Sequence, residues 1–440
     1  MLFVYVFISP ANINWLLMLI KKIKQLLSSQ FIRNVGWLGT AELVNRIFRL
    51  GTTVTLARMF SSQDYGAMAL IYTIFEFANV FTLRGGIGAK IIQANEQDLK
   101  IICNTSFWLN LILGISVFLC QCIAAFPIAQ FYGNQQLVWP ICTLAIVYLI
   151  YPIFMVNSAL IERDNHLKIT ALCNAIQAFV GNVITVVFAL LGMGIWAIVL
   201  PIVLSTPVWV VVTWMNNSWR PPTKFSLDKW REVTSFGKNM LAVEFLNKIR
   251  NNLDYLIVGK FLGTEQLGIY FFAFNAGSGI SINVINTFMS ALFPYICAVR
   301  ENLTEFKQRY FNSLKKILSF VIPIILAQAI LAPIYVPIVF GEKWTTAVPI
   351  LILICLSVIP RVFGWANSLL LNAVDKTHIN LNINLLFTIF FAAAVFLTVQ
   401  WGVFWVAVGV LLSHVLFIPV SVLWSYRYIF HNRTRTLSKV

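Results

Sequence analysis

Runs of about 20 apolar residues recur along almost the whole chain, and they restrict its fold more than any other feature of the sequence. A helix of that length crosses the hydrocarbon core of a bilayer. Six such runs lie in the first half, at approximately 36–57, 66–86, 105–126, 137–158, 170–191 and 194–215. Six more lie in the second half, at approximately 236–258, 267–293, 315–340, 347–371, 380–399 and 402–425. The sequence therefore predicts an all-α, polytopic membrane protein with about twelve spans.

Composition excludes the other broad classes. Of the 440 residues, 59% are apolar and 11% are charged, and the mean hydropathy is +0.81. A soluble chain carries about 25% charged residues, and a soluble core could not bury so much apolar surface. The net charge of +16 does not indicate nucleic acid as a partner, because basic residues mark the cytoplasmic side of a membrane protein.

Lysine and arginine positions set the expected orientation. Of 32 such residues, 23 fall in alternate segments that include both chain ends, and only Arg58, Lys260 and Lys343 fall in the other segments. Both termini are therefore predicted to be cytoplasmic. The predicted outer loops are short, for instance 61–64 and 192–194, which argues against an intramembrane polymerase or ligase that works on the outer face.

A polar stretch divides the chain into two parts. Residues 216–235 are predicted to form a cytoplasmic linker between an N-lobe at 36–215 and a C-lobe at 236–426. Residues 1–35 are expected as a cytoplasmic or interfacial segment, and 427–440 as a basic cytoplasmic tail.

Two local features modify this layout. Met18 opens the amphipathic stretch Met18-Leu-Ile-Lys-Lys-Ile-Lys, which favours a translation start at Met18; an interfacial N-terminal segment is the alternative. The ninth span holds Pro323, Pro333 and Pro337. Because proline removes a helical hydrogen bond, this span is expected to be kinked or broken.

An internal repeat relates the two lobes. A shift of 202 residues aligns the first span with the seventh without a gap. The aligned pairs are Glu42 and Glu244, Asn45 and Asn247, Arg46 and Lys248, Arg58 and Lys260, Ser62 and Thr264, and Gly66 and Gly268. Six crossings return the chain to its starting side, so the lobes are parallel repeats, a recurrent transporter architecture with the substrate path between them.

Charged and amide side chains lie inside the predicted spans, where several share one helical face. The basic ones are Arg46, Arg49, Arg84, Lys248, Arg250 and Arg361, the acidic ones are Glu42, Glu76, Glu244 and Asp254, and the amides are Asn45, Asn247 and Asn251. A charge that faces lipid at mid-depth costs about 2.5–3.5 kcal/mol. We therefore predict that these side chains line one shared, water-accessible interior.

The six basic residues outnumber the four acidic ones, which predicts an anionic substrate, and the guanidinium fork suits phosphate oxygens. The acidic residues either pair with the basic ones or take part in H⁺ or Na⁺ coupling. In a competing interpretation, Glu42 with Arg46 and Glu244 with Lys248 are neutralising pairs that hold helices together. The sequence indicates no catalytic residue, cofactor or metal site, since its four histidines are scattered.

Two stretches carry a resemblance to a known family. The first comprises Arg33-Asn34-Val35-Gly36-Trp37, Leu56-Ala57-Arg58-Met59-Phe60 and Asp64-Tyr65-Gly66. Its counterpart comprises Asn252-Leu253-Asp254-Tyr255, Gly259-Lys260-Phe261-Leu262-Gly263 and Leu267-Gly268-Ile269-Tyr270. In these motifs, and over nearly the whole chain from about residue 30, the sequence resembles the Wzx-type oligosaccharide flippases of the multidrug/oligosaccharidyl-lipid/polysaccharide (MOP) exporter superfamily.

The resemblance implies a V-shaped transporter of two pseudo-symmetric six-helix lobes that alternates between inward-open and outward-open states. Its substrate would be an undecaprenyl-diphosphate-linked oligosaccharide, flipped to the outer leaflet of the bacterial inner membrane for O-antigen, exopolysaccharide or capsule. A polysaccharide polymerase and chain-length machinery would be partners, besides membrane lipids. The alternative is a multidrug or cation antiporter of the same superfamily, and the basic surplus argues against it.

Lipid II flippases of this superfamily keep cavity arginines on spans one, two and eight. Arg46, Arg49 and Arg84 match the first two of these spans by location. The eighth span offers only Asn283 and Asn286 in place of an arginine.

Overall fold

The computed structural model describes residues 48–437, without the side chains of 236–240, 242–243, 280, 283 and 431–437. Its N half consists of the helical residues 48–59 and of α3 Ser62–Val80, α4 Arg84–Gln93, α5 Glu96–Phe131, η1 Gln135–Leu137, α6 Val138–Ala145, α7 Val147–Arg163, α8 Leu167–Leu190, α9 Trp196–Ser205 and α10 Pro207–Asn216. Its C half consists of α11 Trp230–Phe261, α12 Gly263–Cys297, α13 Leu303–Tyr335, η2 Val336–Phe340, η3 Glu342–Ala347, α14 Val348–Ala373, α15 Thr377–Thr398, η4 Val399–Trp401 and α16 Val403–Leu437.

The predicted spans coincide with these helices from the second span onward. Within the described residues, nine helices are long and apolar enough to cross a membrane, or ten when the bent segment from Glu244 to Cys297 is included. That segment contains most of α11, which is less apolar because it carries residues such as Lys248 and Asp254. Most of the first predicted span and the expected start at Met18 lie outside the described residues. The all-α membrane fold is confirmed.

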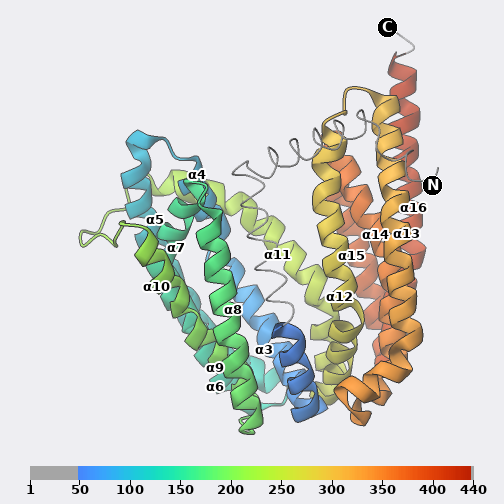
Figure 1. Cartoon of the computed structure of the whole chain (residues 1–440), viewed down its shortest axis with the longest axis horizontal. Helices are drawn as coiled ribbons and strands as arrows, with labels where there is room; N and C mark the ends of the chain where they lie inside the picture. Colours follow the sequence, from blue (N-terminus) through green and yellow to red (C-terminus); the bar gives the residue numbers. More distant parts are fainter. Residues whose placement is uncertain (1–47, 438–440) are drawn as a thin grey trace, which may run out of the picture.

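The helices form two groups that converge at one end of the molecule and diverge at the other, like the arms of a V (Figure 1). At the converging end, α3 packs against α12. The connection 217–229 and the end of α16 lie at the diverging end. Between the groups runs α11, which packs against α3 and α4 of the N half and against α12 and α15 of the C half. The predicted two-lobed architecture is therefore confirmed, with α11 in contact with both halves.

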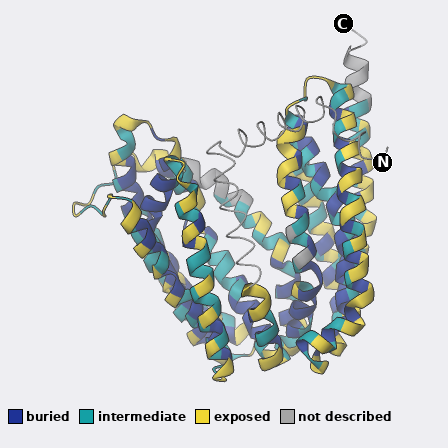
Figure 2. Ribbon diagram, viewed as in Figure 1, coloured by how far each residue is buried: buried dark blue, intermediate teal, exposed yellow. Residues whose placement is uncertain are grey.

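Large apolar side chains are exposed on the outer surfaces of both groups, where Figure 2 shows many exposed residues. Ile123 on α5, Ile330 on α13 and Leu423 on α16 are examples, each more than half exposed. Soluble proteins rarely leave large apolar patches in water, whereas bilayer hydrocarbon covers such a surface. The buried residues lie inside each group and at the converging end, where Tyr65 and Trp344 are buried.

The crossing of α3 and α12 relates the two halves through the sequence repeat. Gly66 lies against the carbonyl group of Thr264, and Gly268 lies against that of Ser62. A Cβ atom on either glycine would lie 1.7 Å from the opposing oxygen, so only glycine allows the helices to cross this closely. The 202-residue shift of the repeat converts one contact into the other, because it aligns Gly66 with Gly268 and Ser62 with Thr264. The two contacts are therefore related by a pseudo-twofold axis.

The ninth span is more regular than its prolines predict. The helix α13 continues through Pro323 and Pro333 as far as Tyr335, so of the kink or break that was expected, a break is absent at these two positions. The helix changes to a π-helical turn only around Pro337. Local adjustments of the backbone hydrogen bonds allow proline inside membrane helices.

The helix of the second span is broken, although no sequence feature predicts a break there. Residues 81–83 separate α3 from α4, and Leu83 has a left-handed φ of 51°. This conformation is uncommon for a residue with a side chain. The break turns the chain so that Arg84 becomes the first residue of α4.

The linker is shorter than predicted and belongs to the N half. It covers 217–229 rather than 216–235, because Trp230 already begins α11. Thr105 donates to the carbonyl oxygen of Asp228 at 2.5 Å. Lys229 forms an ion pair with Asp98 at 2.5 Å. These contacts hold the linker against α5.

Candidate functional site

One cavity lies where α11 faces the N half. It has a volume of about 450 Å³ and is lined by residues of α3, α4, α7 and α11; we call it the α11 cavity. Its ionisable lining residues are Glu76, Arg84, Glu162, Glu244 and Lys248. The Glu244 side chain of α11 reaches α4 at Gly85, where a Cβ atom would lie 3.2 Å from Glu244 Oε1.

Lys248 joins α11 to α3 inside this cavity. Its Nζ lies 3.0 Å from Glu76 Oε2, and the two side chains are 36% and 45% exposed, respectively. Asn252 lies one turn further along α11, is buried, and donates to the same Glu76 oxygen at 3.3 Å. The ion pair thus connects the two halves through groups that remain partly accessible.

Arg84 lies at the cavity wall among aromatic rings. Its guanidinium carbon is 4.6 Å from the ring centroid of Tyr151, 5.1 Å from that of Phe154 and 5.9 Å from that of Trp209. Attraction between a cation and the faces of aromatic rings positions this planar group against α7 and α10. Its several N–H donors suit the oxygens of a phosphate.

A second group of charged side chains lies within the C half. Arg250 donates to Asn384 Oδ1 on α15 and, at 3.1 Å, to Asn247 Oδ1. Asp254 is 3% exposed and accepts a hydrogen bond from the Tyr270 hydroxyl at 2.7 Å. These bonds connect α11 to α15 and α12.

Arg361 of α14 and His414 of α16 complete this group. Arg361 Nε donates to His414 Nε2 at 2.9 Å, and His414 Nδ1 donates to the Val410 carbonyl oxygen at 2.6 Å. One ring nitrogen therefore accepts while the other donates, which makes the imidazole neutral. Arg361 also interacts electrostatically with Asp254. We call this set the C-half cluster, comprising Arg250, Asp254, Tyr270, Arg361, Asn384 and His414.

The structure divides the predicted interior residues into two groups, which differs from the single interior expected. Those in the α11 cavity are Glu76, Arg84, Glu244 and Lys248. Those in or beside the C-half cluster are Asn247, Arg250, Asp254 and Arg361. Arg49 and Asn251 are exposed, and Glu42, Asn45 and Arg46 lie outside the described residues. Lys248 pairs with Glu76 on another helix, not with Glu244 as the neutralising-pair interpretation proposed.

The charge balance and membership of the α11 cavity also differ from expectation. Its described lining holds three carboxylates and two cations, not a basic surplus. Glu162 is not among the predicted interior residues. It lies beyond the predicted end of the fourth span, whereas α7 extends to Arg163. His414 is also missing from the predicted set, because it is a single histidine in an apolar run. Its position inside the twelfth span is the sequence feature that indicates an interior role. No group of acidic, histidine or cysteine side chains that could hold a metal occurs among the described residues.

At the converging end, basic side chains of each half bind carbonyl groups of the other. Arg58 donates to the carbonyl oxygens of Val339 at 3.0 Å and Ile338 at 2.7 Å. Lys260, aligned with Arg58 by the repeat, donates to the Phe131 carbonyl oxygen at 2.8 Å. Carbonyl groups at helix C-termini carry partial negative charge, which favours these cations. We call the Arg58 and Lys260 contacts the two latches.

A third basic residue reinforces this closure. Lys343 Nζ donates to the carbonyl oxygens of Arg58 at 2.8 Å and Phe60 at 2.7 Å. The buried Trp344 donates from its indole nitrogen to the Ala57 carbonyl oxygen at 2.8 Å. Arg58, Lys260 and Lys343 are the three basic residues outside the spans that were predicted to lie on the outer side. All three contribute to closing this end.

Comparison with known sequences gives the family. Residues 55–349 match the family described as polysaccharide biosynthesis protein, over more than half of the chain. The teichuronic acid biosynthesis protein TuaB of Bacillus subtilis is 25% identical over 80% of this chain and 73% of its own length. The lipopolysaccharide biosynthesis protein WzxC of Escherichia coli is 24% identical over 91% of this chain and 81% of its own length.

Solved structures give the fold. An inward-facing MATE family transporter of the MOP superfamily superposes with a TM-score of 0.70 at 14% identity, covering 89% of this chain and 96% of its own. The lipid II flippase MurJ in an inward closed conformation gives a TM-score of 0.73 at 12% identity, covering 89% of this chain and 87% of its own. The resemblance seen in the sequence is confirmed: the chain belongs to the polysaccharide biosynthesis protein family and has the fold of MOP superfamily transporters.

Proposed function

We propose that this protein is a flippase that carries lipid-linked oligosaccharide units across the membrane for the synthesis of a surface polysaccharide. It would act as a secondary transporter that forms and breaks no covalent bond in its substrate. The observation that carries this proposal is the α11 cavity, where Arg84 of the N half and Lys248 of the C half line one space. Family membership and the polysaccharide biosynthesis roles named for TuaB and WzxC support it.

The chemistry of the cavity fits the charged part of such a substrate. In an undecaprenyl-diphosphate-linked oligosaccharide, the diphosphate is anionic and would bind Arg84 and Lys248. Binding would displace Glu76 from Lys248 and so remove an ion pair between the halves. The latches would then have to open for release at the converging end. Substrate binding and rearrangement of the halves are linked in this way.

We also propose that the protein lies in a bacterial inner membrane with its diverging end, both termini and the linker in the cytoplasm. The excess of lysine and arginine on that side supports this orientation. In a variant with the native cysteines replaced, Thr223→Cys in the linker should resist membrane-impermeant thiol reagents in intact cells. Gln136→Cys at the converging end should react readily. The opposite pattern would reverse the proposed topology.

An H⁺ or Na⁺ gradient is the proposed energy source. Glu76 is the carboxylate whose protonation or cation binding would free Lys248, since the two form the ion pair of the cavity. Flipping by the purified protein in proteoliposomes should respond to an imposed gradient of one of these ions. Equal rates with and without both gradients would exclude this coupling.

Deletion of the gene tests the function directly. Cells without it should lose a surface polysaccharide and accumulate its lipid-linked precursor on the cytoplasmic leaflet. Complementation should restore both. Oligomerisation of the units by a polymerase and chain-length machinery would follow on the outer side. Normal surface polysaccharide in the deletion strain would contradict the proposal.

A cation or multidrug antiporter is the second candidate, favoured by the three carboxylates in the described lining of the α11 cavity. It predicts that the deletion strain keeps its polysaccharide and becomes sensitive to cationic dyes such as ethidium. The family match favours the flippase, and the deletion strain separates the two functions.

A further inference from the structure

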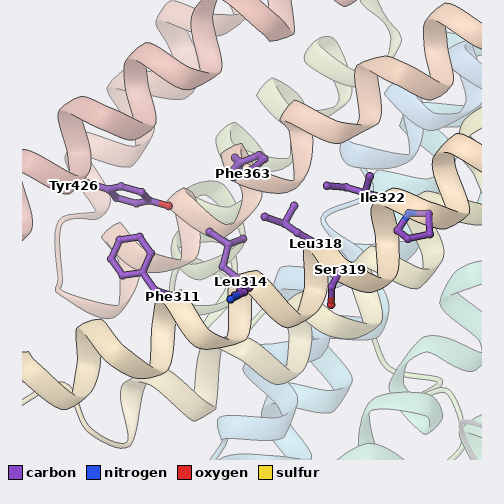
Figure 3. Close-up of a pocket in the computed structure, with 9 residues that line it drawn as sticks. Phe311, Leu314, Leu318, Ser319, Ile322, Phe363 and Tyr426 are labelled. Carbon is purple, nitrogen blue, oxygen red and sulfur yellow. The ribbon is translucent and has the colours of Figure 1, made fainter.

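A second cavity, of about 570 Å³, lies within the C half and shares no lining residue with the α11 cavity. Its walls come from α13 and α16, and Phe363 of α14 forms its floor (Figure 3). Leu314, Leu318 and Ile322 of α13 point into it from successive turns. Figure 1 places α13 and α16 on the side of the C half away from the N half. We call this cavity the α13–α16 groove.

One end of the groove lies at the membrane boundary. About 20 residues of helix cross the hydrocarbon. Counted along α16 from Val403 at the converging end, this length ends roughly three residues before Tyr426. Counted from Phe340 toward the N-terminus of α13, the same length ends roughly five residues short of Lys315. Both lining residues therefore lie at the headgroup level of the leaflet on the diverging side. Pro323, at the other end of the groove, lies about 12 Å deeper.

Aromatic side chains close the groove on the headgroup side. The rings of Phe311 and Tyr426 lie 5.2 Å apart, and the hydroxyl oxygens of Tyr310 and Tyr426 lie 2.8 Å apart. Such contacts join α13 and α16 above the groove. Below them, Leu314, Leu318 and Ile322 give the groove an apolar wall.

A single lysine gives the groove its charge. Lys315 is exposed and is the only lysine, arginine or acidic residue among the described residues that line the groove. It forms no ion pair with any other residue that the structure describes. The nearest carboxylate along α13 is that of Glu305, which is paired with Arg309 at 2.6 Å and lies about 15 Å along the helix from Lys315. A cation at headgroup level above an apolar groove is complementary to a phosphate that carries an acyl chain.

We propose that the α13–α16 groove binds an anionic phospholipid, with one acyl chain between α13 and α16 and its phosphate at Lys315. The apolar lining accepts the chain, and the lysine selects a headgroup with net negative charge over a zwitterionic one. This site is separate from the flipping path and does not depend on the proposed function.

Binding of dioleoylphosphatidylglycerol to the purified full chain, followed by native mass spectrometry, tests the proposal. Lys315→Gln should weaken binding about fivefold, the effect of one basic residue near an anionic surface. Lys316→Gln is the matched control, because Lys316 is exposed on the next position of α13 and does not line the groove. Ser319→Phe should also weaken binding, since it fills the groove from an exposed position.

Equal losses in the two lysine variants would overturn the proposal, as would equal binding of phosphatidylcholine to the natural chain. Displacement of phosphatidylglycerol by a polyprenyl phosphate would identify the occupant as a substrate tail and would also overturn it. Melting temperatures of the lipid-free variants should match that of the natural chain. If Ser319→Phe does not fold, Lys315→Gln against Lys316→Gln decides the outcome.

Discussion

Lys248 and Glu76 illustrate how a charged pair inside a membrane protein can serve function more than stability. Both side chains are more than a third exposed, and exposed ion pairs contribute only about 0.2–1 kcal/mol to folding. Loss of this pair should therefore leave the fold intact. Its position between the halves makes it a candidate for exchange with substrate.

We predict that Lys248→Met lowers flipping at least about tenfold, the effect of losing one charge-assisted hydrogen bond, while protein level and melting temperature stay close to normal. Flipping of lipid-linked oligosaccharide in proteoliposomes measures the first, and thermal unfolding the second. The control is the exchange Glu76→Lys with Lys248→Glu, which rebuilds the pair with reversed charges. Full activity of the exchanged variant would show a purely structural role.

Asp254 presents the opposite case, since it is buried and provides negative charge beside Arg361 in the C-half cluster. Asp254→Asn should lower the free energy of unfolding by about 1 kcal/mol, because it removes the buried negative charge that interacts with the half-buried guanidinium of Arg361. Adding Arg361→Gln should recover part of that loss. Thermal unfolding of the single and double variants measures both effects.

Asp164→Asn serves as the control for this prediction, because Asp164 is an exposed loop residue at the diverging end. It should leave the melting temperature unchanged. Additive losses in Asp254→Asn with Arg361→Gln, instead of recovery, would show that the two charges do not stabilise one another.

At the scale of elements, the crossing of α3 and α12 depends on two residues without side chains. Close packing of membrane helices relies on such small residues, because the surrounding lipid is as apolar as the helices themselves. The crossing also sets the distance between the halves at the converging end. The break at 81–83 then directs α4 toward α11, which brings Arg84 to the cavity.

Gly66→Ala should force α3 and α12 apart and reduce the amount of folded protein in the membrane severalfold. The reason is the 1.7 Å separation between the new Cβ atom and the Thr264 carbonyl oxygen. Quantitative blotting and size-exclusion chromatography measure the loss. Gly51→Ala is the matched control, because a Cβ atom there meets nothing within 4 Å and alanine favours a helix. Similar protein levels for both variants would contradict the proposed role of the crossing.

At the scale of the whole molecule, the two latches hold the converging end closed while the other end diverges. Each uses a basic residue from the end of one helix and carbonyl groups from the opposite half. Lys343 and Trp344 add further contacts between the halves. Opening of the converging end requires that these contacts break, so each of them favours the closed arrangement.

Arg58→Ala combined with Lys260→Ala should shift the population toward a state open at the converging end. Spin labels at Gln136 and Thr346 should report longer distances there, and labels at Asp164 and Glu301 shorter distances at the diverging end. Arg220→Ala is the control, because the acceptors of Arg220 among the described residues are carbonyl groups of its own half, for instance that of Trp214 at 2.9 Å. Unchanged distance distributions in the double variant would show that the latches do not control the closure.

The amino-acid sequence alone predicts the membrane fold, most of the spans after the first, the division into two halves, the repeat and the family. These depend on properties that are local along the chain. A run of apolar residues enters the bilayer whatever it later packs against. The glycines at 66 and 268 could likewise be aligned before their contact was known. The linker boundary and the proline-rich ninth span were predicted less well, because helix ends depend on packing.

The partners of the charged side chains depend on how the helices pack. Lys248 has Glu244 one turn away in its own helix, yet it pairs with Glu76, 172 residues distant in sequence. His414 and Arg361 meet in the same way across two helices. The periodicity of an α-helix determines which of its side chains share a face. Which other helix this face contacts depends on how the helices cross and on where a helix is broken. The physical reason is that these contacts require backbone approaches that no local pattern encodes.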